Sequence, residues 1–413
     1  MIVEIDAARL TSELDVLGTI TDAAPPAVTR VVFGDADLRA RAFITGLCDE
    51  AGLTVRHDAV GNTFARWAGT MADRPAVATG SHIDAIPNAG RFDGTVGVLG
   101  GLESIRALQR AGFTPARSIE LVLFTAEEPT RFGIGCLGSR LLAGTLSESA
   151  GDQLKDSSGR TLNEVRTGAG FAGPLADVRL PALAYRAFVE LHIEQGPLLE
   201  RQALDIGVVT AIAAPAGLKI SIEGEGGHAG AVLMADRRDA FLAAAEIALA
   251  VEAAATGTGA IDTVGTVGVC QVFPGAVNSV PSRTLLEVDV RDIDGDRRDR
   301  VLGEIAAACD EVARRRRVTV TRQLVNADPP AACAPPVVAA IERSADALGL
   351  AAQRMISRAY HDSLFMSRVA PTAMIFIPCR GGISHRPDEY ASPDAITRGA
   401  AVLAGTLAEL SGD

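Results

Sequence analysis

Histidine is scarce in this chain, and most of its copies stand in segments that could do chemistry. Five of the six histidines fall in acidic or glycine-rich motifs, and only His57 does not. The five motifs are GSHIDAIPNAGRFDG (80–94), ELHIEQGPLLE (190–200), GEGGHA (224–229), AYHD (359–362) and GGISHRPDE (381–389). Imidazole nitrogen and carboxylate oxygen are both ligands of divalent metals, so these motifs indicate a metal site.

The first motif offers two candidate ligands and one candidate support. His82 and Asp93 could both bind a metal ion. Asp84 lies two residues beyond His82, on the same side of an extended segment. It could accept the second N–H of the imidazole and fix the orientation of the ring. The alternative is a structural histidine beside an aspartate, the commoner origin of an isolated HxD sequence.

Two adjacent glutamates follow a strongly apolar segment. Glu127 and Glu128 stand in FTAEEPTR, where burial without partners would be costly. One interpretation is a solvated turn. The other gives them separate tasks, in which one binds a metal and the other takes a proton from a metal-bound water. Neighbouring residues at a strand end point in different directions, which suits two roles.

These motifs converge on the ends of predicted strands. His82, His192 and His385 lie at or just after such ends, and so do Asp93 and the glutamate pair. Nitrogen and carboxylate ligands without cysteine suit zinc, manganese or cobalt in a hydrolytic role. Five candidate ligands, with Asp93 as a bridge, favour two metals about 3.5–4 Å apart over one.

The elements that must position these residues alternate in type along the first part of the chain. Short apolar runs predict strands at Pro75–Gly80, Ser118–Thr125 and Phe188–Ile193, and helical spacing covers Gly94–Gly112. This alternation predicts an α/β fold, with a mostly parallel mixed sheet and helices on both faces. Ligands of such sheets bind at the carboxyl ends of the strands.

The segment from about Gly207 to Ala327 has a different pattern. Its order strand–helix–strand–strand–helix–strand suits a small α+β sandwich. The predicted strands are Leu218–Glu223, Thr263–Phe273, Thr284–Asp292 and Arg317–Leu324, and the predicted helices are Asp236–Ala255 and Gly295–Arg316. A proline-rich linker, Asp328–Pro336, precedes a helix (Val337–Leu348), a strand ending near Ile377 and a last helix (Pro393–Leu410).

A chain of 413 residues exceeds what one hydrophobic core usually serves. We therefore expect a discontinuous catalytic domain, residues 1–210 and 330–413. A smaller domain, residues 211–329, is inserted in its middle.

The composition bounds the partners and the compartment. A formal charge of -12 gives no general attraction to nucleic acid or anionic lipid, whereas metals and a local arginine could still attract a small anionic substrate. The apolar stretch Phe241–Ala255 contains Glu246 and Glu252, and it is too short and too charged to span a bilayer. The six cysteines form no CxxC pair, and the N-terminus has no basic-then-apolar signal pattern. We expect a cytoplasmic protein with neither nucleic-acid nor membrane partners.

The order HxD, Asp, Glu-Glu, HIEQGP, GHAG and a late GISH resembles that of the dinuclear metal-dependent amidohydrolases related to aminoacylases and carboxypeptidase G. HIEQGP together with RFDG is similar to one subgroup. That subgroup contains the N-carbamoyl-L-amino acid hydrolases, β-ureidopropionases, allantoate amidohydrolases and ureidoglycolate amidohydrolases. The resemblance extends from about Asp35 to Ala408.

The resemblance implies a role for each motif residue of the metal site. His82 and His192 would bind one metal, Glu128 and His385 the other, and Asp93 would bridge two zinc or manganese ions. Glu127 would be the general base and later the acid, and Asp84 would support His82.

It also implies a substrate pocket. His228, from the inserted lid or dimerisation domain, would polarise the scissile carbonyl, often in the partner subunit's site, so a homodimer is implied. Asn278 and Arg291 would hold the substrate carboxylate. Further pocket residues would be Gln195, His361 and Tyr360, the last reading a substrate hydroxyl.

Two of these pocket roles have plain alternatives. His228 could be a turn residue that merely caps its loop. Arg291 could be an ordinary strand arginine paired with Asp289 or Asp292.

Several stretches look most similar to the ureidoglycolate amidohydrolases, among them FTAEEPTRFGIGCLGSRLLAG (124–144), SRAYHDSLFM (357–366) and MIFIPCRGGISHRPDEY (374–390). Other subgroup members more often have a Gly-Ala-Gly-His-Asp type of sequence where this chain has RAYHD (358–362), a difference that should alter substrate contacts rather than metals. The implied reaction cleaves the ureido C–N bond of ureidoglycolate to give glyoxylate, ammonia and carbon dioxide.

Alternative functions remain at this point. Within the subgroup these are allantoate or N-carbamoyl-L-amino acid hydrolysis. The site could also serve an exopeptidase, although HIEQGP argues against it by resemblance. An alternative of a different class is a non-catalytic binding protein with the same fold. The loss of a metal ligand or of Glu127 from the sequence would indicate such a protein. The sequence has lost none of them.

Overall fold

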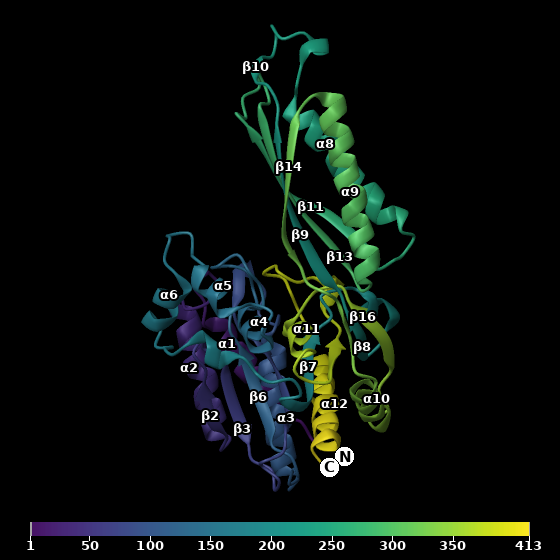
Figure 1. The fold of residues 1–413 in the computed structure, drawn as a ribbon. Coiled ribbons are helices and arrows are strands. Elements are labelled where there is room, and N and C mark those ends of the chain that lie inside the picture. The colour runs from purple at the N-terminus through teal and green to yellow at the C-terminus, as the bar shows by residue number, and fades with distance from the viewer. Residues whose placement is uncertain (1, 413) are drawn as a thin grey trace. The chain divides into compact units, whose positions relative to one another are not determined.

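The chain folds into two units, which the computed structural model describes over residues 2–412. Unit 1 consists of Met1–Ala211, Cys333–Ser357 and His361–Asp413, and unit 2 of Ile212–Ala332 and Arg358–Tyr360. The first and the last described segments, purple and yellow in Figure 1, therefore belong to unit 1. Residues 1 and 413, the outer limits of the predicted catalytic domain, lie outside the described residues.

Unit 1 is built on a mixed sheet whose central strands are parallel. The strands run in the order β8–β17–β7–β4–β6–β3–β2, with β16 beside β8. Their bounds are β2 (Thr54–His57), β3 (Thr63–Trp67), β4 (Ala76–His82), β6 (Ile119–Phe124), β7 (Tyr185–Ile193), β8 (Ile206–Ile212), β16 (Ala352–Ser357) and β17 (Thr372–Ile377). Strands β6, β4, β7 and β17 pair in parallel, and β2, β3 and β8 join antiparallel. The predicted mixed sheet is thus present, with parallel strands at its centre and antiparallel strands toward its edges.

Helices cover both faces of this sheet, because alternate strand residues point to opposite sides. Thr79 of β4 faces α3 at Gly101, whereas Ala78 packs in the cluster that contains Leu137 and Leu141 of α4. Helix α12 lies beside α3 and also contacts β7 (Figure 1). The helices of unit 1 are α1 (Ala7–Thr19), α2 (Asp35–Glu50), α3 (Thr95–Arg110), α4 (Leu137–Ala143), α5 (Glu148–Gln153), α6 (Leu162–Gly168), η1 (Leu175–Val178), α7 (Leu198–Gln202), α10 (Pro335–Ala347), α11 (Asp362–Met366), η3 (Arg380–Gly382) and α12 (Pro393–Ser411).

Unit 2 is an antiparallel sheet covered by two long helices. The strands β9 (Ala214–Glu223), β11 (Val264–Phe273), β13 (Arg283–Asp292) and β14 (Thr319–Ala327) lie in the order β11–β13–β9–β14. Their inward residues pack against α8 (Ala240–Gly257) and α9 (Gly295–Arg316) in one apolar core. The short elements of unit 2 are β10 (Gly227–His228), which pairs with β12 (Ser279–Val280), β15 (Ala331–Ala332) and η2 (Met234–Asp236). In unit 1, the short strand β1 (Val28–Arg30) pairs with β5 (Ala85–Ala89).

Two local expectations differ from the structure. Pro335 and Pro336 start α10 instead of lying in a linker, because proline is tolerated in the first turn of a helix. Helix α8 extends beyond the apolar stretch seen in the sequence, and by length and composition it is long and apolar enough to cross a membrane. Its inward residues, such as Ile247 and Val251, belong to the core of unit 2, which is the packing expected of a core helix.

Candidate metal centre

The candidate ligands lie where the parallel strands of unit 1 end. His82 is the last residue of β4 and His192 the last but one of β7. Glu127 and Glu128 follow β6, and His385 lies in the loop between β17 and α12. Because these strands are parallel neighbours, their carboxyl ends meet at one edge of the sheet.

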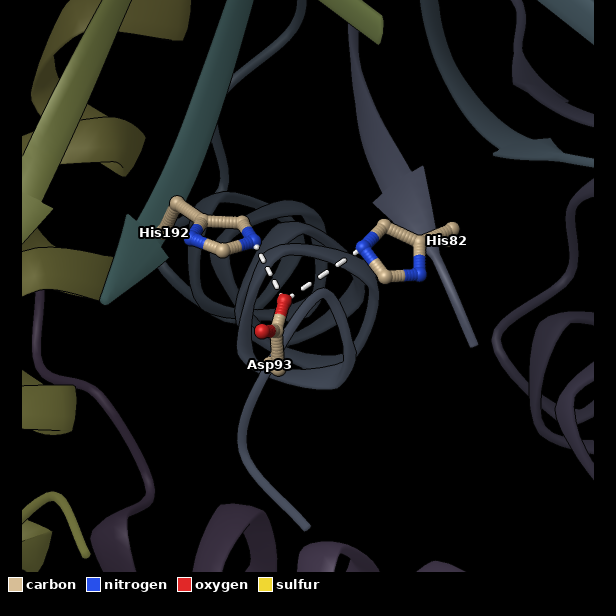
Figure 2. A group of neighbouring side chains, drawn as sticks. All are labelled: His82, Asp93 and His192. Carbon is tan, nitrogen blue, oxygen red and sulfur yellow. Dashed lines mark ion pairs between the residues drawn. The ribbon is translucent and has the colours of Figure 1, made fainter. Parts of the chain in front are cut away.

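Asp93, just before α3, is the centre of the site. Its Oδ1 lies 3.1 Å from Nε2 of His192 and 3.5 Å from Nε2 of His82. Figure 2 shows both rings pointing a nitrogen at this one oxygen. The three residues lie close enough together to hold one metal ion.

The other carboxylate oxygen of Asp93 faces a second group. Nε2 of His385 lies 3.3 Å from Asp93 Oδ2 and 3.2 Å from Oε1 of Glu128. These three residues also lie close enough together to hold a metal ion. The structure thus brings all five predicted ligands together in two groups that share Asp93.

Hydrogen bonds leave two imidazole nitrogens suited to a cation. Nδ1 of His192 lies 2.9 Å from the backbone oxygen of Ile193, and Nδ1 of His82 lies 3.0 Å from the backbone oxygen of Asp84. Each Nδ1 therefore carries a proton, so in the neutral ring the lone pair belongs to Nε2, the nitrogen that faces Asp93. At His192 this nitrogen also lies 3.1 Å from the backbone N–H of Gly94, which donates to it. Lone pairs and carboxylate oxygens that converge in this way match the donor set of zinc or manganese.

Asp84 supports the site differently from the sequence expectation. Its carboxylate lies 3.6 Å from Nδ1 of His82, farther than its backbone oxygen. The carboxylate oxygens instead accept the backbone N–H groups of Glu127 (3.2 Å) and Glu128 (3.0 Å). Burial, helped by the carboxylates of Glu128 and Asp37, raises the pKa of Asp84 to about 6. Asp84 therefore joins the loop of His82 to the loop of the glutamate pair.

Glu127 belongs to neither ligand group. It is buried, and its Oε2 lies 3.7 Å from Nε2 of His82. Burial and the neighbouring carboxylates of Glu128 and Asp362 raise its pKa well above the ordinary value. The Cys136 thiol donates a hydrogen bond of 3.4 Å to Oε1. A carboxyl group held beside the ligands with its pKa raised is suited to acid–base chemistry.

The charges of the site depend on one another. Burial works against the charged form of Asp93, but hydrogen bonds from the three imidazoles outweigh it and lower its pKa well below the ordinary value. Asp93 and Glu128 raise the pKa of His385 to about 11. Burial opposes the charging of His82, but Glu127 and Asp93 raise its pKa. The carboxylates thus require positive charge among them, which a divalent cation also provides.

Two predicted pocket residues also belong to unit 1. Nε2 of Gln195 donates to Asp93 Oδ2 at 2.7 Å, and the residue holds a left-handed φ of 53°. His361 is buried, with its ring centroid 4.5 Å from that of His192 and its Nε2 3.1 Å from Ser357 Oγ. His361 therefore packs against a candidate ligand.

The remaining predicted residues lie in unit 2, at opposite ends of its long strands. His228 is exposed in β10, and the backbone N–H of the next residue donates to the backbone oxygen of Asn278 at 2.9 Å. Arg291 is at the other end of β13, where its guanidinium lies 5.6 Å from the ring centroid of Tyr360. Arg291 also donates from Nε to Asp289 at 2.8 Å, the pairing that the sequence left open as its alternative role.

Sequence reasoning missed two residues that contact Asp93. Ser384 Oγ lies 2.7 Å from Asp93 Oδ2, and Glu389 accepts the backbone N–H of Asp93 at 3.1 Å. Burial and the charge of Asp93 raise the pKa of Glu389 to about 7. Both residues stand in the GGISHRPDE motif, so their closeness to His385 was the available signal.

Comparisons with known proteins agree with this geometry. A model of the family described as peptidase family M20/M25/M40 matches residues 78–409. The ureidoglycolate hydrolase of Arabidopsis thaliana is 53% identical over 416 residues, which cover 99% of this chain and 87% of that protein. The N-carbamoyl-L-amino acid amidohydrolase of Geobacillus stearothermophilus is 38% identical over 412 residues, 98% of this chain and 99% of that protein. The crystal structure of AtUAH in complex with glyoxylate superposes with a TM-score of 0.92 at 52% identity, covering 100% of this chain and 99% of that chain.

Proposed function

The chain belongs to peptidase family M20/M25/M40, and from this premise we propose that it hydrolyses the ureido C–N bond of ureidoglycolate. The products are glyoxylate, ammonia and carbon dioxide. The substrate assignment rests on the 53% identity to a ureidoglycolate hydrolase across 99% of the chain. The resemblance found in the motifs is confirmed by these relatives.

The ligand groups support a centre of two divalent ions per subunit, zinc or manganese. His82, His192 and Asp93 Oδ1 would hold one ion, and Glu128, His385 and Asp93 Oδ2 the other. When bound, such ions act as Lewis acids toward the carbonyl and lower the pKa of water at the site.

Glu127 is the proton carrier in this proposal. It lies beside the ligands without belonging to either group, so its carboxylate can take the proton of the attacking water. The same carboxyl group then gives the proton to the leaving nitrogen. The carbamate formed in this step releases carbon dioxide, and the remaining hydroxyglycine loses ammonia to become glyoxylate.

The length of β13 supports a homodimer with shared sites. Between Arg283 and Arg291 the strand spans about 26 Å, at a rise of ~3.3 Å per residue. His228 and Asn278 lie beyond one end of this strand and Arg291 at the other. A substrate as small as ureidoglycolate cannot contact both ends of one rigid unit. We therefore infer that Arg291 and the pair formed by His228 and Asn278 act at different sites of a homodimer.

The substrate carboxylate has a candidate partner in Arg291. Asp289 occupies the side of the guanidinium that carries Nε, and the Tyr360 ring lies over its face. The two groups fix the plane of the guanidinium, which suits bidentate recognition of a carboxylate. In unit 1, the candidate substrate-binding residues are Gln195 and His361.

The second candidate is hydrolysis of allantoate or an N-carbamoyl-L-amino acid, which the 38% identical relative favours. The test uses protein stripped by a chelator and reloaded with zinc or manganese. Ammonia release is then measured from ureidoglycolate, allantoate and N-carbamoyl-L-amino acids. We expect kcat/KM for ureidoglycolate to exceed the others by roughly 10²-fold, the scale on which a pocket discriminates between substrates that differ by small groups. A clear preference for a carbamoyl amino acid would overturn the substrate and leave the site intact. Metal binding without turnover of any of them would support the non-catalytic alternative.

A further inference from the structure

Two segments from opposite ends of the chain meet at one buried carboxylate. Oε1 of Glu389 accepts the backbone N–H groups of Phe92 (2.7 Å) and Asp93 (3.1 Å). Glu389 itself stands four residues after His385. Its carboxylate therefore ties the backbone that carries Asp93 to the loop that carries His385.

The second oxygen of Glu389 continues this link through Ser384. The Ser384 hydroxyl lies 2.9 Å from Glu389 Oε2 and 2.7 Å from Asp93 Oδ2. A hydroxyl has one proton and can donate to only one of these oxygens at a time. Since Gln195 also donates to Asp93 Oδ2, the Asp93 oxygen nearest to His385 is held from two directions.

Space for this carboxylate depends on a glycine. A Cβ at Gly90 would lie 2.3 Å from the Cβ of Glu389, so a side chain there would displace it. Glu389 is 5% exposed, and such burial of a carboxyl group is costly unless hydrogen bonds compensate it. Tyr390 adds an apolar contact, because its ring lies 6.0 Å from that of Phe92 between centroids.

We propose that Glu389 is a positioning residue, which holds Asp93 and His385 in the relative placement that a shared metal centre needs. This proposal rests on the ligand assignment of the proposed function. Glu389 itself belongs to neither of the two ligand groups. Its contribution is to order the ligands before metal binds, as outer hydrogen-bond partners of metal ligands do.

The test compares Glu389→Ala and Glu389→Gln with Asp388→Asn as a matched control. Asp388 is the adjacent carboxylate on the same loop, exposed and paired with Arg386. Metal affinity is measured by competition with a chelator, and ligand geometry by the visible absorption of the cobalt-loaded protein. Thermal unfolding of the metal-free proteins reports folding.

We expect Glu389→Ala to weaken metal binding by about 10–100-fold and to change the cobalt spectrum. Saturating metal should restore much of kcat with an unchanged KM. Glu389→Gln keeps an oxygen for the two N–H groups and should recover most of the affinity, and Asp388→Asn should match wild type. If Glu389→Ala does not fold, Ser384→Ala replaces it, with a smaller loss of affinity expected.

Wild-type metal affinity in a folded Glu389→Ala or Ser384→Ala protein would overturn the proposal. So would an equal loss in Asp388→Asn. A failure of the proposed function looks different, because wild type itself would then bind no metal or would not hydrolyse ureidoglycolate.

Discussion

At the scale of single residues, the centre depends on a division of labour between carboxylates. Asp93 turns one oxygen to His82 and His192 and the other to His385. Glu128 belongs to the ligand group of His385, and Glu127 belongs to neither ligand group. The Asp84 carboxylate accepts hydrogen bonds from two backbone N–H groups instead. The carboxylates thus differ in what they contact, which is why their predicted roles differ.

Replacing Glu127 with glutamine should separate metal binding from turnover. The amide keeps the size of the side chain but cannot accept a proton, so kcat should fall by about 10²–10⁴-fold, the usual contribution of a general base. Metal content, measured by elemental analysis, should equal that of wild type. A variant with near wild-type kcat would contradict the assignment of Glu127.

Replacing Asp84 with alanine should destabilise the loop that carries Glu127 and Glu128. Two buried N–H groups would lose their acceptor, at a cost of about 1–3 kcal/mol each in the free energy of unfolding. Chemical denaturation measures this loss, and Asp84→Asn, which keeps one acceptor oxygen, should lose less. Equal stability of wild type and Asp84→Ala would show that the carboxylate does not hold this loop.

The types and motif positions of these residues could be predicted from sequence, but their partners could not. Histidine and carboxylate motifs after strands were enough to select four candidate ligands and the glutamate pair, and the choice of Glu128 within that pair came from the family resemblance. The acceptor of the His82 N–H and the contact between Glu389 and Asp93 depend on how loops from distant parts of the chain turn after folding. Such contacts leave no periodic pattern in the sequence.

At the scale of elements, the start of α3 fixes the distance between Asp93 and His82. Gly94 has a φ of 66°, and a Cβ there would lie 2.5 Å from the His82 ring. Gly112, after the other end of α3, has a φ of 72° and no atom within 4 Å of its Cβ position. The two glycines share the same backbone constraint and differ in what a side chain would meet.

Comparing Gly94→Ala with Gly112→Ala should therefore distinguish the effect of backbone strain from the effect of a steric clash with the His82 ring. Both should lose roughly 1–2 kcal/mol of stability, because an L-residue is strained in the left-handed region. Only Gly94→Ala should also displace His82 and lose metal affinity, measured by chelator competition. Equal metal affinities in the two variants would contradict the close packing of Gly94 on His82.

An ion-pair cluster joins α8 to α9 in unit 2. Glu246 accepts hydrogen bonds from Arg315 and Arg316, and these hydrogen bonds lower its pKa to about 2. Because the pKa is lowered, the cluster contributes its full stabilisation at pH values above the ordinary pKa of 4.5. This stabilisation is lost as the pH falls toward 2.

Glu246→Gln should cost at most about 1 kcal/mol near neutral pH, since solvent screens exposed pairs. The difference from wild type should shrink as the pH falls from 5 to 3, followed by chemical denaturation. Glu252→Gln, an exposed glutamate of the same helix, is the control and should show no such trend. A pH-independent difference for Glu246→Gln would contradict the ion-pair explanation.

The long elements were predictable and the short ones were not. Helix α9 has the predicted bounds, and the buried strands β4, β6 and β7 lie where apolar runs placed them. Long periodic segments carry their own signal in sequence. Strands such as β1 and β5 have few residues and form because they pair with each other after folding.

At the scale of the whole molecule, the proposed site uses two copies of the chain. His228 and Arg291 are too far apart in unit 2 to meet at one small substrate, so each complete site would combine two subunits. Mixing two inactive variants can test this arrangement. A heterodimer of Glu127→Gln and His228→Ala would contain one site with both changes and one site with neither.

We expect this heterodimer, purified by two different affinity tags, to regain up to half of wild-type activity while each homodimer stays inactive. Light scattering after size-exclusion chromatography should give the mass of a dimer. Activity absent from the heterodimer would place His228 in the site of its own subunit, and a monomer would remove the shared site altogether.

We expect the metal-loaded protein to hydrolyse ureidoglycolate at its ureido carbonyl, with cleavage of a C–N bond there. Product analysis tests it most directly, with ammonia, urea and glyoxylate followed together during turnover. We expect wild type to release ammonia and glyoxylate without urea. We expect Glu127→Gln to release neither ammonia nor glyoxylate. Urea as the nitrogen product, or no turnover of ureidoglycolate by protein with both metal sites filled, would contradict it.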